Sequence, residues 1–205
     1  MVALFLAVAL GAQVEVERVV ALVNGVPILV SDVELAEIAA LVPHAESESP
    51  AEYRNVVAEA LVLLALRWQD LDVAGVTSRT AVDLAAAWAS VVTRAGGVET
   101  LREQLRAVGL DEALLRALVR RAAIVQAYVG TRFAPFIRPT ANEVETVYRD
   151  ELAPQLVATG KVAPPLVQVR AQVEALVRER KLNTEIARWT DELERRGEVI
   201  RYFKR

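Results

Sequence analysis

The sequence of 205 residues contains no cysteine and only one histidine, His44. Without cysteine the chain has no disulfide framework, no thiolate nucleophile and no Cys-ligated zinc site. A single histidine cannot build a multi-histidine metal site, and His44 follows Pro43 in a polar segment. We therefore interpret His44 as a solvated loop residue rather than as a metal ligand or a member of a catalytic triad.

Phosphate-binding loops are missing from the sequence as well. The nine glycines are scattered, and neither GxGxxG nor GxxxxGK followed by Ser or Thr occurs. Carboxylate pairs such as Glu143/Glu145 and Asp150/Glu151 lie in predicted helices without an accompanying nucleophile or cofactor motif, so we interpret them as solvated helix faces. The sequence thus predicts a protein that is not an enzyme and that needs no cofactor or metal.

The chain also lacks a strong charge of one sign. Its net charge is −3 and its pI is about 5.4, whereas a sequence-independent nucleic-acid binder is normally strongly basic. Basic clusters occur at Arg116, Arg120 and Arg121 and at Arg178, Arg180 and Lys181. They lack interleaved aromatic residues, so we interpret them as exposed helix faces and expect no nucleic-acid partner. Hydrophobic residues make up 54% of the chain, which excludes disorder as its overall class.

The first residues, Met1 to Gln13 (MVALFLAVALGAQ), form the longest apolar segment. It is shorter than the roughly 20 residues that span a bilayer, and no other uncharged run predicts an integral membrane segment. The segment resembles the h-region and cleavage end of a secretory signal, with Leu10-Gly11-Ala12 near the small-x-small rule, although no Lys or Arg precedes Arg18. We interpret residues 1–13 as a signal peptide incomplete at its N-terminus, which predicts a periplasmic protein; the alternative is a buried strand or helix.

Strand patterns occur at both ends of the remaining chain. Two apolar runs, Arg18–Val23 and Val26–Val30, flank Asn24-Gly25, which is the strongest local signal for a β-hairpin. Pro27 cannot donate a hydrogen bond to a neighbouring strand, so the second strand should be short and at a sheet edge. The segment from Glu198 to Phe203 alternates like a strand, and we expect it to pair with the hairpin.

The sequence between these strands predicts helices. Their start signals are capping residues at Ser31, Ser49, Thr77, Asp111 and Thr140, and a last long helix should run from Leu166 to Arg196. Residues 152–166 contain three prolines and a glycine and are the only linker-like stretch. The predicted fold class is mostly α with a small β element, and residues 14–205 should form one domain.

The order of these motifs resembles that of SurA-type periplasmic chaperones. The resemblance rests on Val16–Ile28 (VERVVALVNGVPI) followed by Ser31-Asp32-Val33, on Leu101–Leu110 (LREQLRAVGL), on Phe136–Val144 (FIRPTANEV) with Tyr148, and on Val169–Phe203. In that family, parvulin prolyl-isomerase domains usually precede the last helix, and here residues 152–166 occupy their place. The resemblance therefore implies a chaperone core without the isomerase.

This resemblance implies an ATP-independent holdase that binds unfolded, outer-membrane-type polypeptides in an apolar groove. Tyr128, Phe133 and Phe136 lie close together in the sequence; they could belong to the core, or some of them could line that groove. The alternative function is a structural or assembly subunit that uses the same apolar faces for a permanent partner or a homodimer interface. A prolyl isomerase is a third class, but the family builds its active site in the domain that is missing here.

Overall fold

The computed structural model describes residues 17–203, and the signal-peptide-like segment 1–13 lies outside them. The fold is mostly helical with a three-stranded antiparallel sheet, which confirms the predicted class. The strands are β1 (Val19–Val23), β2 (Val26–Leu29) and β3 (Val199–Arg201). The helices are α1 (Val30–Ile38), α2 (Pro50–Val73), α3 (Leu84–Arg94), α4 (Val98–Ala107), α5 (Glu112–Arg132), the 3-10 turn η1 (Ala134–Phe136), α6 (Ala141–Val147), the π-helical turn η2 (Tyr148–Leu152), α7 (Ala153–Ala158) and α8 (Leu166–Arg196).

The sheet joins the first described residues to the last. Asn24 and Gly25 have φ values of 50° and 78°, as a type I′ turn requires. β3 pairs with β1, so the strand order is β2-β1-β3, and β2 with Pro27 lies at an edge as predicted. Asn24 fixes this closure, because its N–H donates to Glu198 O and its Oδ1 accepts from Glu198 N–H, both at 2.8 Å. A Cβ at Gly197 would lie 2.7 Å from Asn24 Oδ1, so a larger residue there would displace the Asn24 side chain that accepts from Glu198 N–H.

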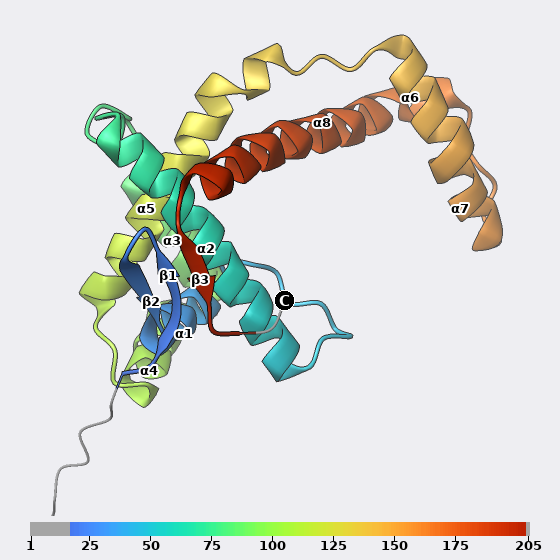
Figure 1. Cartoon of the computed structure of the whole chain (residues 1–205). Coiled ribbons are helices and arrows are strands. Elements are labelled where there is room, and N and C mark those ends of the chain that lie inside the picture. The colour runs from blue at the N-terminus through green and yellow to red at the C-terminus, as the bar shows by residue number, and fades with distance from the viewer. Residues whose placement is uncertain (1–16, 204–205) are drawn as a thin grey trace, which may run out of the picture.

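The main core lies between the inner face of the sheet and α1–α5, and α2 runs through the middle of this body (Figure 1). Its most deeply buried side chains include Val23, Val33, Val57, Leu101 and Leu115. The C-terminal end of the chain completes it, because Leu193 of α8 is buried in this core and Trp189 and Val199 pack against it. The predicted return of the C-terminal strand to the hairpin is therefore confirmed.

Most of the predicted helix starts are present. The Ser49 and Thr140 hydroxyls accept from the N–H groups of Glu52 and Glu143, and each glutamate accepts in return from the N–H of its capping residue, which makes two capping boxes. Asp111 caps α5 by accepting from Ala113 N–H at 2.9 Å.

Two predicted helix starts are wrong. Helix α1 begins at Val30 rather than Ser31, because the Asp32 carboxylate reaches back to accept from Leu29 N–H at 2.9 Å. Helix α3 begins at Leu84 rather than near Thr77, because the Thr77 hydroxyl is buried and donates to Asp72 at 2.7 Å, closing the turn that follows α2.

A second, smaller core lies away from the body. The N-terminal half of α8 projects from the body and packs with α6, η2 and α7 into an arm (Figure 1). Val144, Val173 and Val177 are the buried members of this core. The linker-like stretch is shorter than predicted, since α7 covers residues 153–158 and carries Pro154 in its first turn, where a missing N–H is tolerated.

Ion pairs hold the two sides of the arm together. Lys181 of α8 donates to Glu143 of α6 at 2.7 Å, and Arg180 pairs with Glu151 at 2.6 Å. The hydrogen bond from Lys181, together with those from Thr140, lowers the pKa of Glu143 to about 2. Because the folded pKa lies below the ordinary value of 4.5, this contribution to stability is present above pH 4.5 and is lost as the pH falls through about 2.

Candidate functional site

The three aromatic residues singled out in the sequence do not share one surface. Tyr128 and Phe133, at the end of α5, lie 5.5 and 5.6 Å from the Trp189 ring of α8, measured between ring centroids. Both are half-buried, and they join α5 to α8. Phe136 on η1 is 74% exposed and takes no part in this cluster. The structure thus brings Tyr128 and Phe133 together in a packing contact with Trp189, a residue that the sequence analysis did not connect to them.

An open apolar groove lies elsewhere, on the N-terminal half of α2. Its volume is about 800 Å³. The α2 side chains that line it recur every three or four residues and so form one stripe of the helix: Glu52, Asn55, Val56, Glu59, Ala60 and Leu63. Val42 and Phe203 complete the lining. We call this feature the α2 groove.

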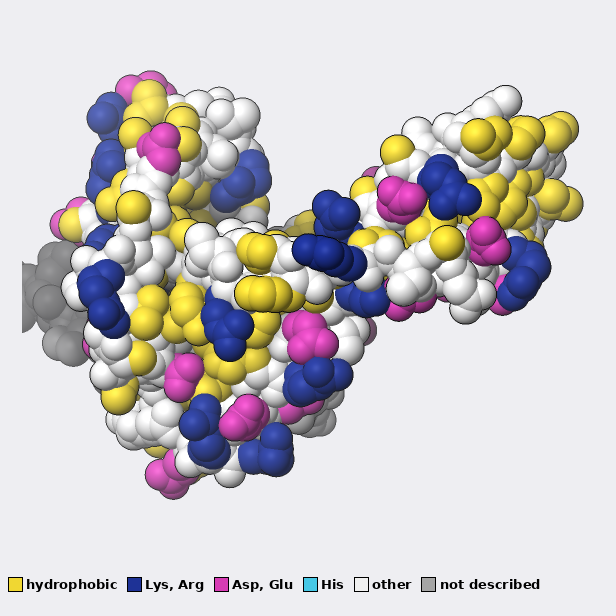
Figure 2. Space-filling model, turned by 90° about the horizontal axis from the view of Figure 1, so that it is seen from above, with side chains coloured by type: hydrophobic (Ala, Val, Ile, Leu, Met, Phe, Trp, Pro, Cys, Tyr) yellow, Lys and Arg dark blue, Asp and Glu magenta, His cyan; other side chains and the backbone are white. Residues whose placement is uncertain are grey.

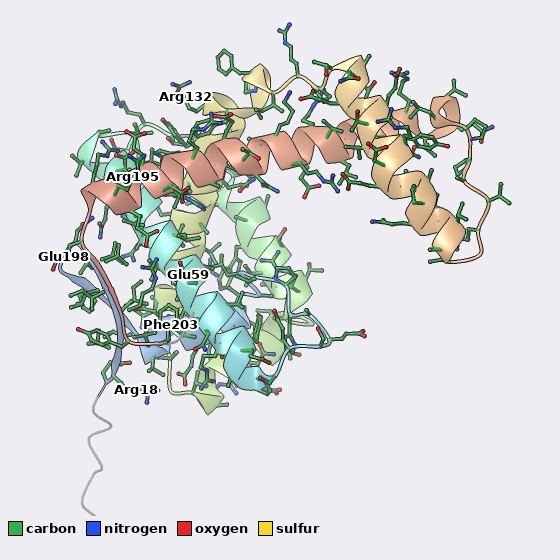
Figure 3. The ribbon with its side chains drawn as sticks, turned by 45° about the vertical axis from the view of Figure 1, so that its right-hand side comes forward. Arg18, Glu59, Arg132, Arg195, Glu198 and Phe203 are labelled. Carbon is green, nitrogen blue, oxygen red and sulfur yellow. The ribbon has the colours of Figure 1, made fainter. Side chains whose placement is uncertain are left out.

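The walls of the α2 groove are held in place by contacts to the body. The Tyr53 hydroxyl donates to Val42 O at 2.9 Å, which fixes the segment between α1 and α2. His44 lies exposed in that segment, with its ring centroid 4.4 Å from that of Tyr53, so it is a loop residue as predicted. On the other side, Phe203 packs against the main core, and Figure 3 shows it near Glu59 of α2.

The two charged side chains that line the α2 groove within residues 17–203, Glu52 and Glu59, are both carboxylates. Glu52 accepts from the Ser49 hydroxyl and N–H, and these hydrogen bonds lower its pKa. Glu59 accepts from the Arg201 guanidinium through both oxygens, at 2.8 and 2.9 Å, and Arg201 also contacts Glu194 at 2.7 Å. Among residues 17–203, no lysine or arginine lines the groove, so the described lining favours an apolar, uncharged or basic segment over an acidic one.

The arrangement of side chains in the α2 groove favours binding of a polypeptide segment. Within residues 17–203, no group of three or more His, Asp or Glu side chains is placed to hold a metal ion. The groove offers an apolar floor of Val56, Ala60 and Leu63 that is open to solvent, and such a surface can take the side chains of an extended polypeptide.

Within residues 17–203, none of the helices has the length and hydrophobicity that a membrane-spanning helix needs.

Sequence reasoning missed the α2 groove because its apolar residues lie beside the buried face. The spacing of Tyr53, Val57, Ala60, Leu64, Trp68 and Leu71 predicts one apolar face of this helix, and Val57 and Leu71 of that set are buried. In the structure, Leu61, Val62 and Leu66 are buried and Ala60 lies in the groove. Residues 60–66 are all apolar, so periodicity alone cannot choose a face there. The useful signal was the surplus of apolar residues, which is enough for a core face and a second stripe.

Comparison with known proteins provides no relative: no protein-family model matches the chain, and no curated protein matches it. The resemblance to SurA-type chaperones therefore stays a prediction based on motif order.

Proposed function

We propose that this protein binds unfolded or extended polypeptides, of the outer-membrane type, in the α2 groove, without nucleotide and without catalysis. The observation that carries the proposal is the open apolar groove itself, which is lined by Val56, Ala60 and Leu63 and supported by a rigid helix of the main core. The groove volume of about 800 Å³ accommodates several side chains.

The proposed mechanism is mass action. A client segment held in the groove is withdrawn from the pool that can aggregate, so the concentration of free unfolded chain falls without any energy source. Each contact should be weak, because the client loses conformational entropy when it is ordered. Suppression of aggregation should therefore require amounts of this protein close to those of the client.

Substitution of Val56 by Arg is expected to weaken this activity strongly. Val56 is 39% exposed and lines the groove, so an arginine there occupies the apolar floor without displacing the core. We expect wild-type protein to suppress aggregation of an unfolded outer-membrane β-barrel protein at about equimolar ratio, and V56R to need several-fold more. Light scattering during dilution from denaturant measures the effect.

Val73→Arg is the matched control, because Val73 is 92% exposed at the far end of the same helix and does not line the groove. V73R should suppress aggregation like the wild type, and both variants should keep the wild-type melting temperature within a few degrees. Equal suppression by V56R and the wild type would show that clients do not use the α2 groove.

We also propose that the protein is exported to the periplasm. The support is the apolar segment Met1–Ala12 followed by the charged residues Glu15, Glu17 and Arg18. The mature protein isolated from its native host should lack this segment, with cleavage near Ala12-Gln13. Intact-mass measurement decides the matter, and a protein that retains Met1 in the cytoplasm contradicts the proposal.

The arm supports a second candidate function, that of an assembly subunit with a fixed partner. Val157, Val162 and Val167 are exposed on the arm, and Figure 2 shows hydrophobic side chains gathered over its far end. Exposed apolar patches of this kind often mark protein–protein interfaces. A stable stoichiometric complex in the host, together with failure of the purified chain to suppress aggregation, would favour this function over the holdase.

A further inference from the structure

The two edges of the sheet differ in their free hydrogen-bonding groups. On β3, the backbone groups of Glu198 and Tyr202 point to β1, since Glu198 O accepts from Asn24 N–H and Tyr202 N–H donates to Val20 O. Successive residues of a strand direct their backbone groups to opposite sides. Val199 and Arg201 therefore direct their N–H and C=O groups away from β1, and among residues 17–203 no strand pairs with that side of β3.

The opposite edge of the sheet, on β2, is closed to a further strand. Pro27 has no N–H to donate. The N–H of Leu29 is already used, because it donates to the Asp32 carboxylate at 2.9 Å. Proline and occupied donors are common means by which proteins protect sheet edges, so the edge of β3 is the one that can accept a strand.

The free edge of β3 lies beside the α2 groove. Arg201 belongs to β3, and its side chain pairs with Glu59, which lines the groove. Phe203, two residues further along the chain, forms part of the lining. A strand added to this edge would continue the sheet across the N-terminal half of α2 and cover Val56, Ala60 and Leu63.

We propose that the free edge of β3 binds an extended client segment of alternating apolar and polar residues as an added antiparallel strand, with the apolar side chains in the α2 groove. This inference rests on the proposed function and specifies how its clients are recognised. Alternation with a period of two is the pattern of strands that form transmembrane β-barrels, so the geometry selects the client class proposed above.

The geometry also specifies which client residues make the hydrogen bonds. Residues directly opposite each other in an antiparallel pair carry their side chains on the same face of the sheet. Val199 packs against the main core and Arg201 reaches Glu59, so both side chains face α2. The client residues hydrogen-bonded to Val199 and Arg201 are therefore those whose side chains enter the groove, and an acidic residue there would face Glu52 and Glu59.

Two N-methylated isomers of one peptide test this geometry. The probe is a fluorescent peptide of about eight residues in which equal numbers of valine and threonine alternate between terminal lysines. One isomer carries N-methyl groups on the valines and the other carries the same number on the threonines. Fluorescence anisotropy with the full chain measures the dissociation constant of each isomer and of the unmethylated peptide.

Methylation of the valines should raise the dissociation constant about tenfold or more, since it removes the N–H groups that face β3. Methylation of the threonines, whose N–H groups point away, should change it less than about twofold. Equal effects of the two isomers would overturn strand addition while leaving binding in the groove intact. No difference between V56R and the wild type in binding the unmethylated peptide would instead contradict the proposed function.

A second copy of the chain is the competing occupant of this edge. Sedimentation velocity of the protein without peptide distinguishes the two, because pairing of two β3 edges produces a dimer. A monomer that binds the unmethylated peptide supports the inference. A dimer that the peptide does not dissociate would overturn it.

Discussion

Removal of residues 166–205 is expected to abolish cooperative unfolding. Leu193 is buried in the main core, and Trp189, Val199 and Phe203 pack against it. Burial of Leu193 alone stabilises the fold by about 2–5 kcal/mol, and the half-buried Trp189 adds to this, so the loss is a large part of the stability of a typical domain. The deletion also leaves a two-stranded hairpin, which is marginal in water.

Polar contacts between α8 and α2 are lost in the same deletion. Arg67 Nε donates to the buried Thr190 hydroxyl at 2.8 Å, and the Trp189 indole donates to Asp70 at 3.3 Å. Burial lowers the pKa of Arg67, and the deletion would leave that guanidinium without its hydroxyl partner. Thermal unfolding followed by circular dichroism should show a broad change in place of a sigmoidal transition.

Leu193→Ala in the full chain is the control for this deletion. It should lower the free energy of unfolding by about 3 kcal/mol while keeping a single transition, since it removes one buried side chain but keeps β3. A truncated chain that melts as sharply and at the same temperature as the intact protein would show that the C-terminal segment is an appendage rather than part of the core.

Phe133→Ser is expected to lower the free energy of unfolding by about 2 kcal/mol, which corresponds to a fall of about 4–8 °C in melting temperature for a chain of this size. Phe133 lies 5.6 Å from the Trp189 ring and 6.2 Å from the Tyr128 ring, so the substitution opens the contact between α5 and α8. Differential scanning calorimetry at constant protein concentration measures the change.

Phe136→Ser provides the matched comparison, since Phe136 is 74% exposed. Its melting temperature should stay within about 2 °C of the wild type. Its suppression of aggregation should also be unchanged if clients bind in the α2 groove. Reduced client binding by F136S with an unchanged melt would place the client site at the end of α5 instead, as the sequence-based hypothesis allows.

The sequence by itself determined much of the local structure of this protein. The Asn24-Gly25 turn, the capping boxes at Ser49 and Thr140, and the limits of α8 at Leu166 and Arg196 are all present as predicted. Each depends on atoms within a few residues of one another, so turn and cap chemistry is sufficient. The return of the C-terminal strand was also predictable, because so short a strand is unstable alone.

The tertiary structure decided the features on which the proposed function depends. Helix α3 begins later than predicted because Thr77 is buried and its hydroxyl donates a hydrogen bond to Asp72. No local sequence motif indicates that a threonine will be buried. Likewise, the sequence did not predict that Trp189 would contact both Tyr128 and Phe133.

The α2 groove and the free edge of β3 show most clearly what local sequence patterns cannot predict. Residues 60–66 are uniformly apolar, so only the packing of the body determined which of them face the core and which line the groove. The register of β3 against β1 then determined that Val199 and Arg201, rather than Ile200, direct their backbone groups outward. Both features depend on segments far apart in the chain, whose relative placement is set by the total free energy of packing rather than by local preference.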